Sequence, residues 1–141
     1  MGVSEGYIHS EITDQILAVF YGVYNELGYG FLESVYRNAL RLALSQNGFI
    51  IEQEVPVSVI FRGQSAGDFR AHLVVNGIIL LELKTAEAIV RAHEAHVINY
   101  LRSTSPELGL ILNFGPKPQV RRLLLDNVEK RKYSRSLGAS N

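Results

Sequence analysis

The sequence predicts a mixed α/β domain in which two N-terminal helices precede a β-meander, a crossover helix and at least one further strand. Three observations support this fold class. Apolar residues recur at helical spacing through residues 12–46. Residues 49–84 read as extended strands joined by turn signals, including an Asn-Gly pair. Residues 108–114 form a short apolar run, which is typical of a strand buried on both faces.

The first helix is expected over residues 12–27, and Gly28 ends it. Its apolar stripe comprises Ile12, Ile16, Val19, Phe20, Val23 and Leu27. The second helix is expected over residues 32–46, and Gly48 follows as a stop signal. Its apolar stripe comprises Leu32, Val35, Tyr36, Ala39, Leu40 and Ala43. Each helix therefore has one face that can pack on a sheet.

Residues 68–84 are predicted to form a β-hairpin. A two-residue turn would pair Val75 with Ile78, whereas a three-residue loop with a bulge at Gly77 would pair Val74 with Ile78. We expect the bulged register, because a one-residue slip exchanges the faces of a strand and this register separates apolar from ionisable side chains. Its apolar face comprises Phe69, Ala71, Leu73, Val75, Ile79, Leu81 and Leu83. Its other face comprises Asp68, Arg70, His72, Glu82 and Lys84.

The remaining elements flank this hairpin. Residues 49–61 read as a strand, and Pro56 places it at an edge of the sheet or at a bend. A helix is expected over residues 89–103, followed by strands at 108–114 and 120–125. Because the helix joins two neighbouring strands of one sheet, we expect those strands to be parallel and the crossover to be right-handed.

These elements form one expected domain, residues 11–127, because a chain of 141 residues with 47% hydrophobic content can bury one substantial core. Residues 1–10 are polar and residues 128–141 are basic and polar, so we expect both ends to be flexible. The chain has no cysteine, no apolar run of about 18 residues and no secretory signal at its N-terminus. We therefore expect a cytoplasmic protein without disulfides or membrane contact.

The charge balance bears on the expected partner. Lys and Arg number 14 and Asp and Glu number 14, which gives a formal net charge of zero. Dedicated nucleic-acid binders usually carry a basic excess, because phosphate contacts supply much of their affinity. Neutral balance lowers the expectation of nucleic-acid binding without excluding it, since charges can be gathered on one face.

Glu82 and Lys84 are the strongest candidates for chemistry, because their i, i+2 spacing places both on one face of a strand. Buried charges are costly unless they are paired or coordinate a metal. A carboxylate can hold a divalent cation that polarises a scissile phosphate, and a lysine can stabilise charge on phosphate oxygens. The alternative is an exposed ion pair on the outer face of the hairpin.

An ordered set of short motifs runs from about residue 12 to about residue 124. The set includes Gly30-x-x-Glu33-x-x-Tyr36, an acid and a turn before Glu82-x-Lys84, the sequence Asn-Tyr-Leu at 99–101, and Gly-Leu-Ile-Leu-Asn-Phe-Gly at 109–115. In these motifs the chain resembles the PD-(D/E)XK nuclease superfamily, and within it the small bacterial group named for GxxExxY. The resemblance implies a restriction-endonuclease-like fold, a divalent metal and hydrolysis of phosphodiester bonds in nucleic acid.

Two positions depart from the pattern of that family. An Arg-Ala-His sequence that ends at His72 stands where the family has Arg-Ala-Asp, and His96 stands where the family has a glutamine. The resemblance implies that Glu82 and Glu33 are metal ligands. His72 and His96 join them as ligands if they converge near Glu82, and the alternative is that the helix histidines, His93 and His96, are surface residues. Because imidazole suits transition metals better than magnesium, we expect manganese or another transition metal.

His72 leaves three alternatives open. Its neutral ring can bind a metal, its presence can mark a site that no longer binds metal, or it can act as a general base in other chemistry. Asp68 lies on the same expected face, but four residues of strand place it about 13 Å away. Asp68 is therefore too distant to replace the missing aspartate.

Glu33 has a second expected role, and three further residues complete the expected site. The resemblance makes Glu33 a catalytic carboxylate, although an acid in the first turn of a helix also interacts favourably with the helix dipole. Tyr36 is expected either to contact substrate or to pack in the core with its hydroxyl bonded to a site carboxylate. The family motif makes Tyr100 a catalytic residue. Arg70 is expected to bind a phosphate or to neutralise Glu82 across the hairpin.

The sequence thus predicts a metal-dependent nuclease with an atypical, histidine-containing site. A catalytically inactive binding module with the same fold is one alternative, and a metal-dependent hydrolase of another substrate is a second. The exposed edge near Pro56 offers a surface for a homodimer, which nothing in the sequence requires.

Overall fold

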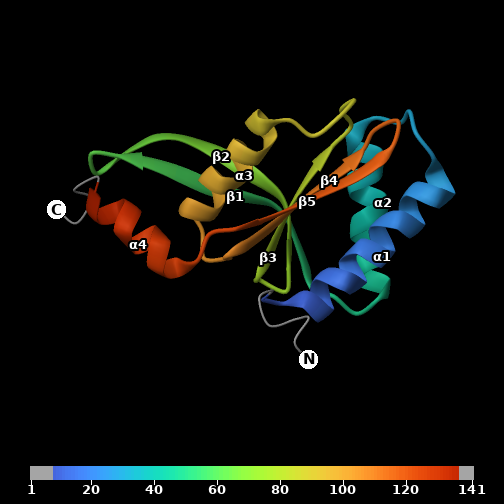
Figure 1. The fold of residues 1–141 in the computed structure, drawn as a ribbon, viewed down its shortest axis with the longest axis horizontal. Helices are drawn as coiled ribbons and strands as arrows, with labels where there is room; N and C mark the ends of the chain where they lie inside the picture. The colour runs from blue at the N-terminus through green and yellow to red at the C-terminus, as the bar shows by residue number, and fades with distance from the viewer. Residues whose placement is uncertain (1–7, 137–141) are drawn as a thin grey trace.

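A five-stranded sheet in the order β1-β2-β3-β4-β5 forms the centre of the computed structural model, which describes residues 8–136 (Figure 1). The elements are α1 (Ser10–Leu27), α2 (Glu33–Gln46), β1 (Ile51–Phe61), β2 (Gln64–Val75), β3 (Ile79–Lys84), α3 (Arg91–Arg102), β4 (Leu108–Phe114), β5 (Pro118–Leu124) and α4 (Asn127–Ser136). Strands β3 and β4 run parallel, and the other neighbouring strands run antiparallel. This mixed sheet with flanking helices confirms the predicted fold class.

The helices cover both faces of the sheet. Helices α1 and α2 pack on one face through buried side chains of their predicted apolar stripes, and α3 packs on the other face (Figure 1). The fully buried stripe residues of α1 and α2 are Ile16, Phe20, Tyr36 and Leu40. Leu32 and Val35 were also expected in the second stripe, but Leu32 is the N-cap residue that precedes α2 and both side chains are exposed.

Strands β3 and β4 form the buried centre of the sheet. Every residue of β4 is buried, as the short apolar run predicted. The parallel register pairs Leu81 with Leu110 and Lys84 with Asn113. The predicted parallel crossover through α3 is therefore confirmed.

The hairpin between β2 and β3 has neither of the two predicted pairings. Val75 pairs with Ile79 and Leu73 pairs with Leu81, so three residues form the loop. Within this loop the backbone N–H of Ile78 donates to the carbonyl of Val75 at 3.0 Å. The shift from the predicted bulged register is two residues, which preserves the faces of the paired segment.

The predicted apolar face of the hairpin is nevertheless interrupted on β2. Leu73 packs with the α1 and α2 cluster, whereas Ala71 packs with the α3 cluster. Phe69 also faces α3, because its ring stacks on Tyr100. Residue pairing of β2 with β3 ends at Leu73, so the outer part of β2 is free to rotate away from β3.

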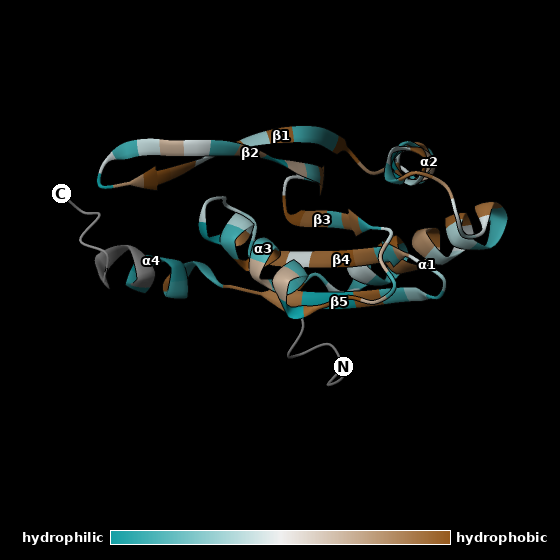
Figure 2. Ribbon diagram, turned by 90° about the horizontal axis from the view of Figure 1, so that it is seen from above, coloured by the Kyte–Doolittle hydropathy of each residue, from teal (hydrophilic) through white to brown (hydrophobic). Residues whose placement is uncertain are grey.

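Strand β1 lies at the edge of the sheet, as Pro56 predicted. Its pairing with β2 continues to the turn at Arg62-Gly63 and contains an irregularity between Val59 and Ile60. Figure 2 shows this pair of strands extending past β3 as an arm, which we call the β1–β2 arm and define as residues 55–70. Most of its residues are exposed.

The ends of the chain differ from expectation in one respect. The predicted flexible N-terminal segment falls largely outside the described residues, and α1 begins at Ser10. At the other end, where a flexible tail was expected, residues 127–136 form α4. Lys130 of α4 donates hydrogen bonds to the carbonyls of Thr104 and Pro106, at 2.8 and 2.6 Å. Among the described residues, no helix is long and apolar enough to cross a membrane.

Candidate functional site

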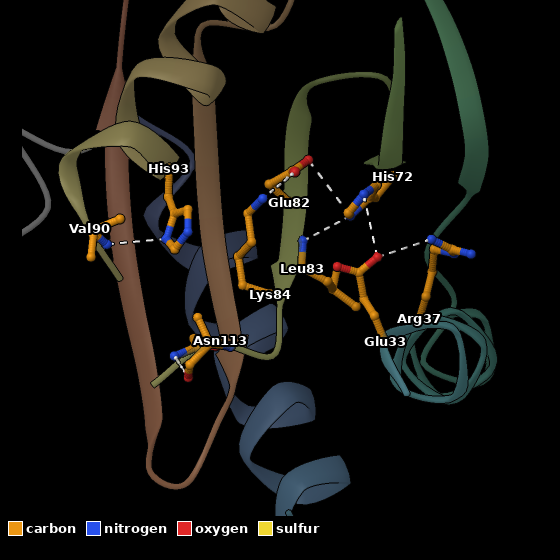
Figure 3. Close-up of polar contacts among 10 residues, drawn as sticks. Glu33, Arg37, His72, Glu82, Leu83, Lys84, Val90, His93 and Asn113 are labelled. Carbon is orange, nitrogen blue, oxygen red and sulfur yellow. Dashed lines mark hydrogen bonds and ion pairs between the residues drawn. The ribbon is translucent and has the colours of Figure 1, made fainter. Parts of the chain in front are cut away.

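Glu82 and Lys84 lie on the central strand β3, on the face that α3 covers (Figure 3). The Glu82 side chain is 3% exposed and the Lys84 side chain 20% exposed, and Lys84 Nζ lies 3.4 Å from Glu82 Oε2. The alternative of an exposed ion pair is therefore wrong. Glu82 is buried at the centre of the sheet and Lys84 is partly buried beside it, so the charge of each depends on its neighbours.

The Glu82 carboxylate is only partly satisfied. Its Oε1 atom is buried and has no hydrogen-bond partner among the described residues. Burial raises the pKa of the Glu82 carboxyl above its usual 4.5, while the nearby His72 and Lys84 oppose this rise. A buried carboxylate with an unsatisfied oxygen destabilises a fold, and such groups are concentrated at functional sites.

His72 stands between two carboxylates (Figure 3). Its Nδ1 atom lies 3.7 Å from Glu82 Oε1, and its Nε2 atom lies 3.7 Å from Glu33 Oε1. Nδ1 also accepts a hydrogen bond from the backbone N–H of Leu83 at 3.1 Å. The structure thus brings together Glu33, His72, Glu82 and Lys84, which the sequence predicted as one site.

Glu33 reaches this site from the first turn of α2. Arg37, one helical turn further along, lies 3.5 Å from Glu33 Oε1 through its Nη1 atom. The same guanidinium lies 3.7 Å from Glu54 Oε2 on β1, so it ties α2 to the sheet edge. Sequence analysis missed Arg37, although its i, i+4 spacing from Glu33 is a recognised signal for a helical ion pair.

Tyr36 lies in the core and holds the turn that precedes Glu33. Its side chain is fully buried, and its ring stacks on Phe114 at 4.4 Å. Its hydroxyl donates to the carbonyl of Gly28 at 2.5 Å and accepts from the N–H of Phe31 at 3.2 Å. The core-packing alternative therefore fits the structure, with a backbone carbonyl in place of a site carboxylate. A fully buried ring offers no surface to a substrate in this conformation.

Tyr100 approaches the site from α3. Its ring stacks on Phe69 at a centroid distance of 4.1 Å. Burial raises the pKa of Tyr100 above 10.0, and the negative charges of Glu82 and Glu33 raise it further. The hydroxyl therefore remains protonated at neutral pH and lies within the electrostatic influence of both carboxylates.

Of the two histidines of α3, His96 is placed differently from expectation. His96 is exposed, and within the described part of the chain it forms no ion pair with Glu33 or Glu82. His93 lies beside Lys84 in Figure 3, and its Nδ1 atom accepts the N–H of Val90 at 3.1 Å. Burial lowers the pKa of His93, as do the charges of Lys84 and His96. His93 was not among the predicted site residues.

Arg70 and Asp68 lie on the β1–β2 arm, apart from the buried pair. Arg70 Nη1 donates to the carbonyl of Glu54 at 3.1 Å, and Asp68 Oδ1 accepts from the Ser58 hydroxyl at 2.8 Å. Arg70 therefore does not neutralise Glu82. Phosphate binding by Arg70 stays a prediction, and it requires a substrate that extends along the arm.

A buried polar network supports the loop that follows Lys84. The Asn113 side chain is fully buried, accepts the N–H of Ala86 at 2.9 Å and donates to the Ala86 carbonyl at 2.9 Å. Gln119 Oε1 accepts the N–H of Ile89 at 3.0 Å. Sequence analysis assigned no role to these residues, although an asparagine inside an apolar strand signals a specific partner.

The site can be tested for its fit to a divalent metal. Among the described residues, no three His, Cys, Asp or Glu side chains are arranged to hold a metal ion together. A hard cation such as magnesium, however, commonly uses one or two carboxylates, with water and substrate as its other ligands. Glu82, with its unsatisfied oxygen, and Glu33 on the other side of His72 fit that description. These two carboxylates are therefore the oxygen donors that would hold such a metal.

Comparisons with known proteins agree with this architecture. A family model described as the PD-(D/E)XK nuclease superfamily matches residues 10–123. Three chains of solved structures match, and one is the crystal structure of SSO0001, with a TM-score of 0.55 and 19% sequence identity. That likeness covers 77% of this chain and 59% of that chain, less than two thirds of its length, and shows the fold alone. No curated protein matches. Because the family model covers most of the chain, including α1 to α3, β1 to β4 and the Glu82–Lys84 pair, the chain belongs to the PD-(D/E)XK nuclease superfamily.

Proposed function

We propose that this protein hydrolyses phosphodiester bonds of nucleic acid with the help of a divalent metal ion, as a member of the GxxExxY group. The observation that carries the proposal is the buried Glu82–Lys84 pair, with one Glu82 oxygen unsatisfied, facing Glu33 across His72. A fold keeps such a costly arrangement when the site binds a cation or a charged substrate.

Glu82 and Glu33 would hold the metal. When bound, a divalent ion polarises the scissile phosphate and lowers the pKa of bound water. The preference for manganese or another transition metal, which the sequence suggested, would require a nitrogen ligand in addition to these carboxylates. Exposed His96 on α3 could supply one only if its side chain turned toward the site.

Lys84 and Tyr100 would act on the substrate. The Lys84 ammonium, 3.4 Å from Glu82, is placed to attract a phosphate oxygen and to stabilise the negative charge that develops there. The Tyr100 phenol, which burial and the two carboxylates keep protonated, can donate a hydrogen bond to the same group. Arg70 would extend binding along the β1–β2 arm.

A second candidate function is a catalytically inactive binding module. It is favoured by the replacement of the family aspartate with His72 and by the lack of a three-ligand metal cluster in the described part of the chain. Such a module would bind nucleic acid or a protein through the same face without turnover.

Metal binding and cleavage together test the proposal. Calorimetric titration with magnesium and with manganese should show binding to the wild type and none to Glu82→Ala. Labelled DNA and RNA should be cleaved only with metal, and Lys84→Ala should abolish cleavage while keeping most metal binding. Lys132→Ala, which removes an exposed lysine on α4, is the matched control and should retain full activity.

Three outcomes would contradict the proposal or a part of it. Absence of binding for both metals would support the inactive binding module. Cleavage that persists in Lys84→Ala would remove Lys84 from the mechanism, and hydrolysis of a different metal-dependent substrate without nucleic-acid cleavage would support another hydrolase.

A further inference from the structure

Followed outward from the hairpin loop, the backbone pairing of β2 with β3 ends one residue before it reaches His72. The last paired residues are Leu73 and Leu81. Leu83, two residues further along β3, continues to pair with Leu112 of β4 on its other side. The Leu83 N–H that faces β2 has lost its main-chain acceptor, because the outer part of β2 pairs with β1 alone. Leu83 is fully buried, so an unpaired N–H at this position would be costly.

The His72 ring replaces the missing strand partner. Its Nδ1 atom accepts the Leu83 N–H at 3.1 Å. A neutral imidazole has one nitrogen with a lone pair and one with a hydrogen. Since Nδ1 accepts, the hydrogen is on Nε2, the nitrogen that lies 3.7 Å from Glu33 Oε1. A doubly protonated ring would lose the bond to Leu83.

This bond leaves His72 without a lone pair for a metal. Nδ1 is engaged by Leu83, and Nε2 carries the hydrogen. For the same reason neither nitrogen can accept a proton from a substrate while the bond is intact. The geometry therefore disfavours two of the sequence-based alternatives for His72, those of metal ligand and general base.

We propose that His72 is a positioning residue that closes the gap between β2 and β3 and holds Glu33 opposite Glu82, so that the metal is bound by oxygen ligands alone. The inference deepens the proposed function, on which its metal part rests. It predicts that the site accepts magnesium as well as manganese, in contrast to the imidazole-based expectation.

The first test is the tautomer of His72, read from the ¹⁵N and ¹H resonances of its imidazole in the full chain. The resonances are assigned with His72→Gln, and His93 and His96 serve as internal references. We expect the Nε2–H tautomer in the metal-free protein and after titration with magnesium or zinc, both of which are diamagnetic. A switch to Nδ1–H with metal on Nε2 would overturn the proposal.

The second test uses hydrogen exchange of the Leu83 amide, with Leu81 as the reference within the same strand. In His72→Asn the side-chain oxygen can occupy the place of Nδ1, so Leu83 should keep its protection. His72→Gln presents its amide near the place of Nε2, so Leu83 should exchange about tenfold faster relative to Leu81. Equal protection in both variants would contradict the role assigned to Nδ1.

Metal affinity separates this inference from the proposed function. His72→Asn should bind magnesium within about threefold of the wild type, since both carboxylates remain, a change below about 1 kcal/mol. Loss of magnesium binding in His72→Asn, with Leu83 still protected, would identify His72 as a ligand. If the wild type binds no metal, the proposed function fails, whereas the tautomer and the Leu83 amide still decide the positioning role.

Discussion

At the scale of the residue, the site depends on a few side chains whose polar atoms are nearly all engaged in hydrogen bonds. The His72 ring bonds to Leu83, and the Tyr36 hydroxyl bonds to Gly28 and Phe31. Glu82 is the exception, because its Oε1 atom has no hydrogen-bond partner among the described residues. His72 and Tyr36 thus support the structure of the site, while Glu82 keeps a carboxylate oxygen that can bind a ligand.

Glu82→Gln is expected to stabilise the metal-free protein by about 1 kcal/mol at pH 8, since active-site residues often cost stability. The pKa of Glu82 is raised on folding, so the folded state binds a proton more tightly than the unfolded chain. Wild-type stability contributed by this group therefore falls as pH rises from about 4.5 through the folded-state pKa. The advantage of Glu82→Gln should accordingly be larger at pH 8 than at pH 4.

Denaturant unfolding at the two pH values, in the presence of a chelator, measures this difference. Glu87→Gln, which changes an exposed glutamate in the loop after β3, is the control and should have almost no effect at either pH. A destabilised Glu82→Gln variant at pH 8 would mean that its pairing with Lys84 outweighs the cost of burial.

At the scale of the element, the end of β4 positions the loop that leaves β3. Asn113 bonds to both backbone groups of Ala86, and Gly115 allows this close approach. A Cβ atom on Gly115 would lie 2.0 Å from the Ala86 carbonyl oxygen. The loop that leaves β3 therefore meets the end of β4 at a contact with no space for a side chain.

Gly115→Ala is expected to destabilise the protein by about 2–3 kcal/mol, because backbone has to move to admit the methyl group. Gly22→Ala is the matched control, since a Cβ atom there meets nothing within 4 Å. In the middle of α1 that control should raise stability by about 0.5–1 kcal/mol. Thermal unfolding of both variants measures the contrast, and equal effects would contradict the predicted clash.

Helix α4 lies beyond the residues that the family model matches. Lys130 anchors it to the carbonyls of Thr104 and Pro106, which follow the end of α3. Thr104 in turn donates its hydroxyl to the carbonyl of Tyr100 at 2.7 Å. The C-terminal helix is therefore connected to the side of the site that Tyr100 forms.

Lys130→Met is expected to destabilise the protein by about 1 kcal/mol and to increase hydrogen exchange at residues 104–106, because these carbonyls lose a charged donor. Lys132→Met is the control. Lys132 is two residues away, is exposed and pairs only with Glu129 in the described chain, so its change should leave exchange at 104–106 unaltered. If both variants show the same hydrogen exchange at residues 104–106, the result would contradict the anchoring role of Lys130.

At the scale of the whole molecule, charge and shape both favour weak self-association. The formal net charge is zero at pH 7, so molecules repel one another little. The β1–β2 arm presents Ile60 and Phe61, each 60% exposed, near an unpaired strand edge. Strand edges of this kind pair readily with other chains, although Pro56 interrupts the row of donors. The sequence offered this edge as a surface for a homodimer without requiring one, and nothing in the structure tests it.

Ile60→Lys is expected to reduce self-association, measured by static light scattering near pH 7 at low salt. It adds one charge and removes an apolar side chain from the arm. Leu42→Lys adds the same charge at a residue of α2 that is 53% exposed and lies outside the arm. If both variants reduce association equally, net charge and not the arm is responsible.

The sequence by itself determined the order of the elements from α1 to β5, the buried strands β3 and β4, and the shared face of Glu82 and Lys84, but not α4. These features follow from local periodicity: helical spacing in α1 and α2, a continuous apolar run in β4, and the two-residue repeat of a strand. Motif order also determined that Glu33 and His72 belong to the same site as Glu82.

Only the tertiary structure decided how that site is held together. Four features were decided in this way: the hairpin register, the hydrogen bond from Leu83 to His72, the core position of Tyr36 and the contact of Arg37 with Glu54. Each depends on segments that are distant in sequence or on the point where two strands separate. A hydrogen bond is set by the position of its partner, which local patterns do not contain. The sequence therefore gives the residues of the site, and packing decides which of their atoms are free to act.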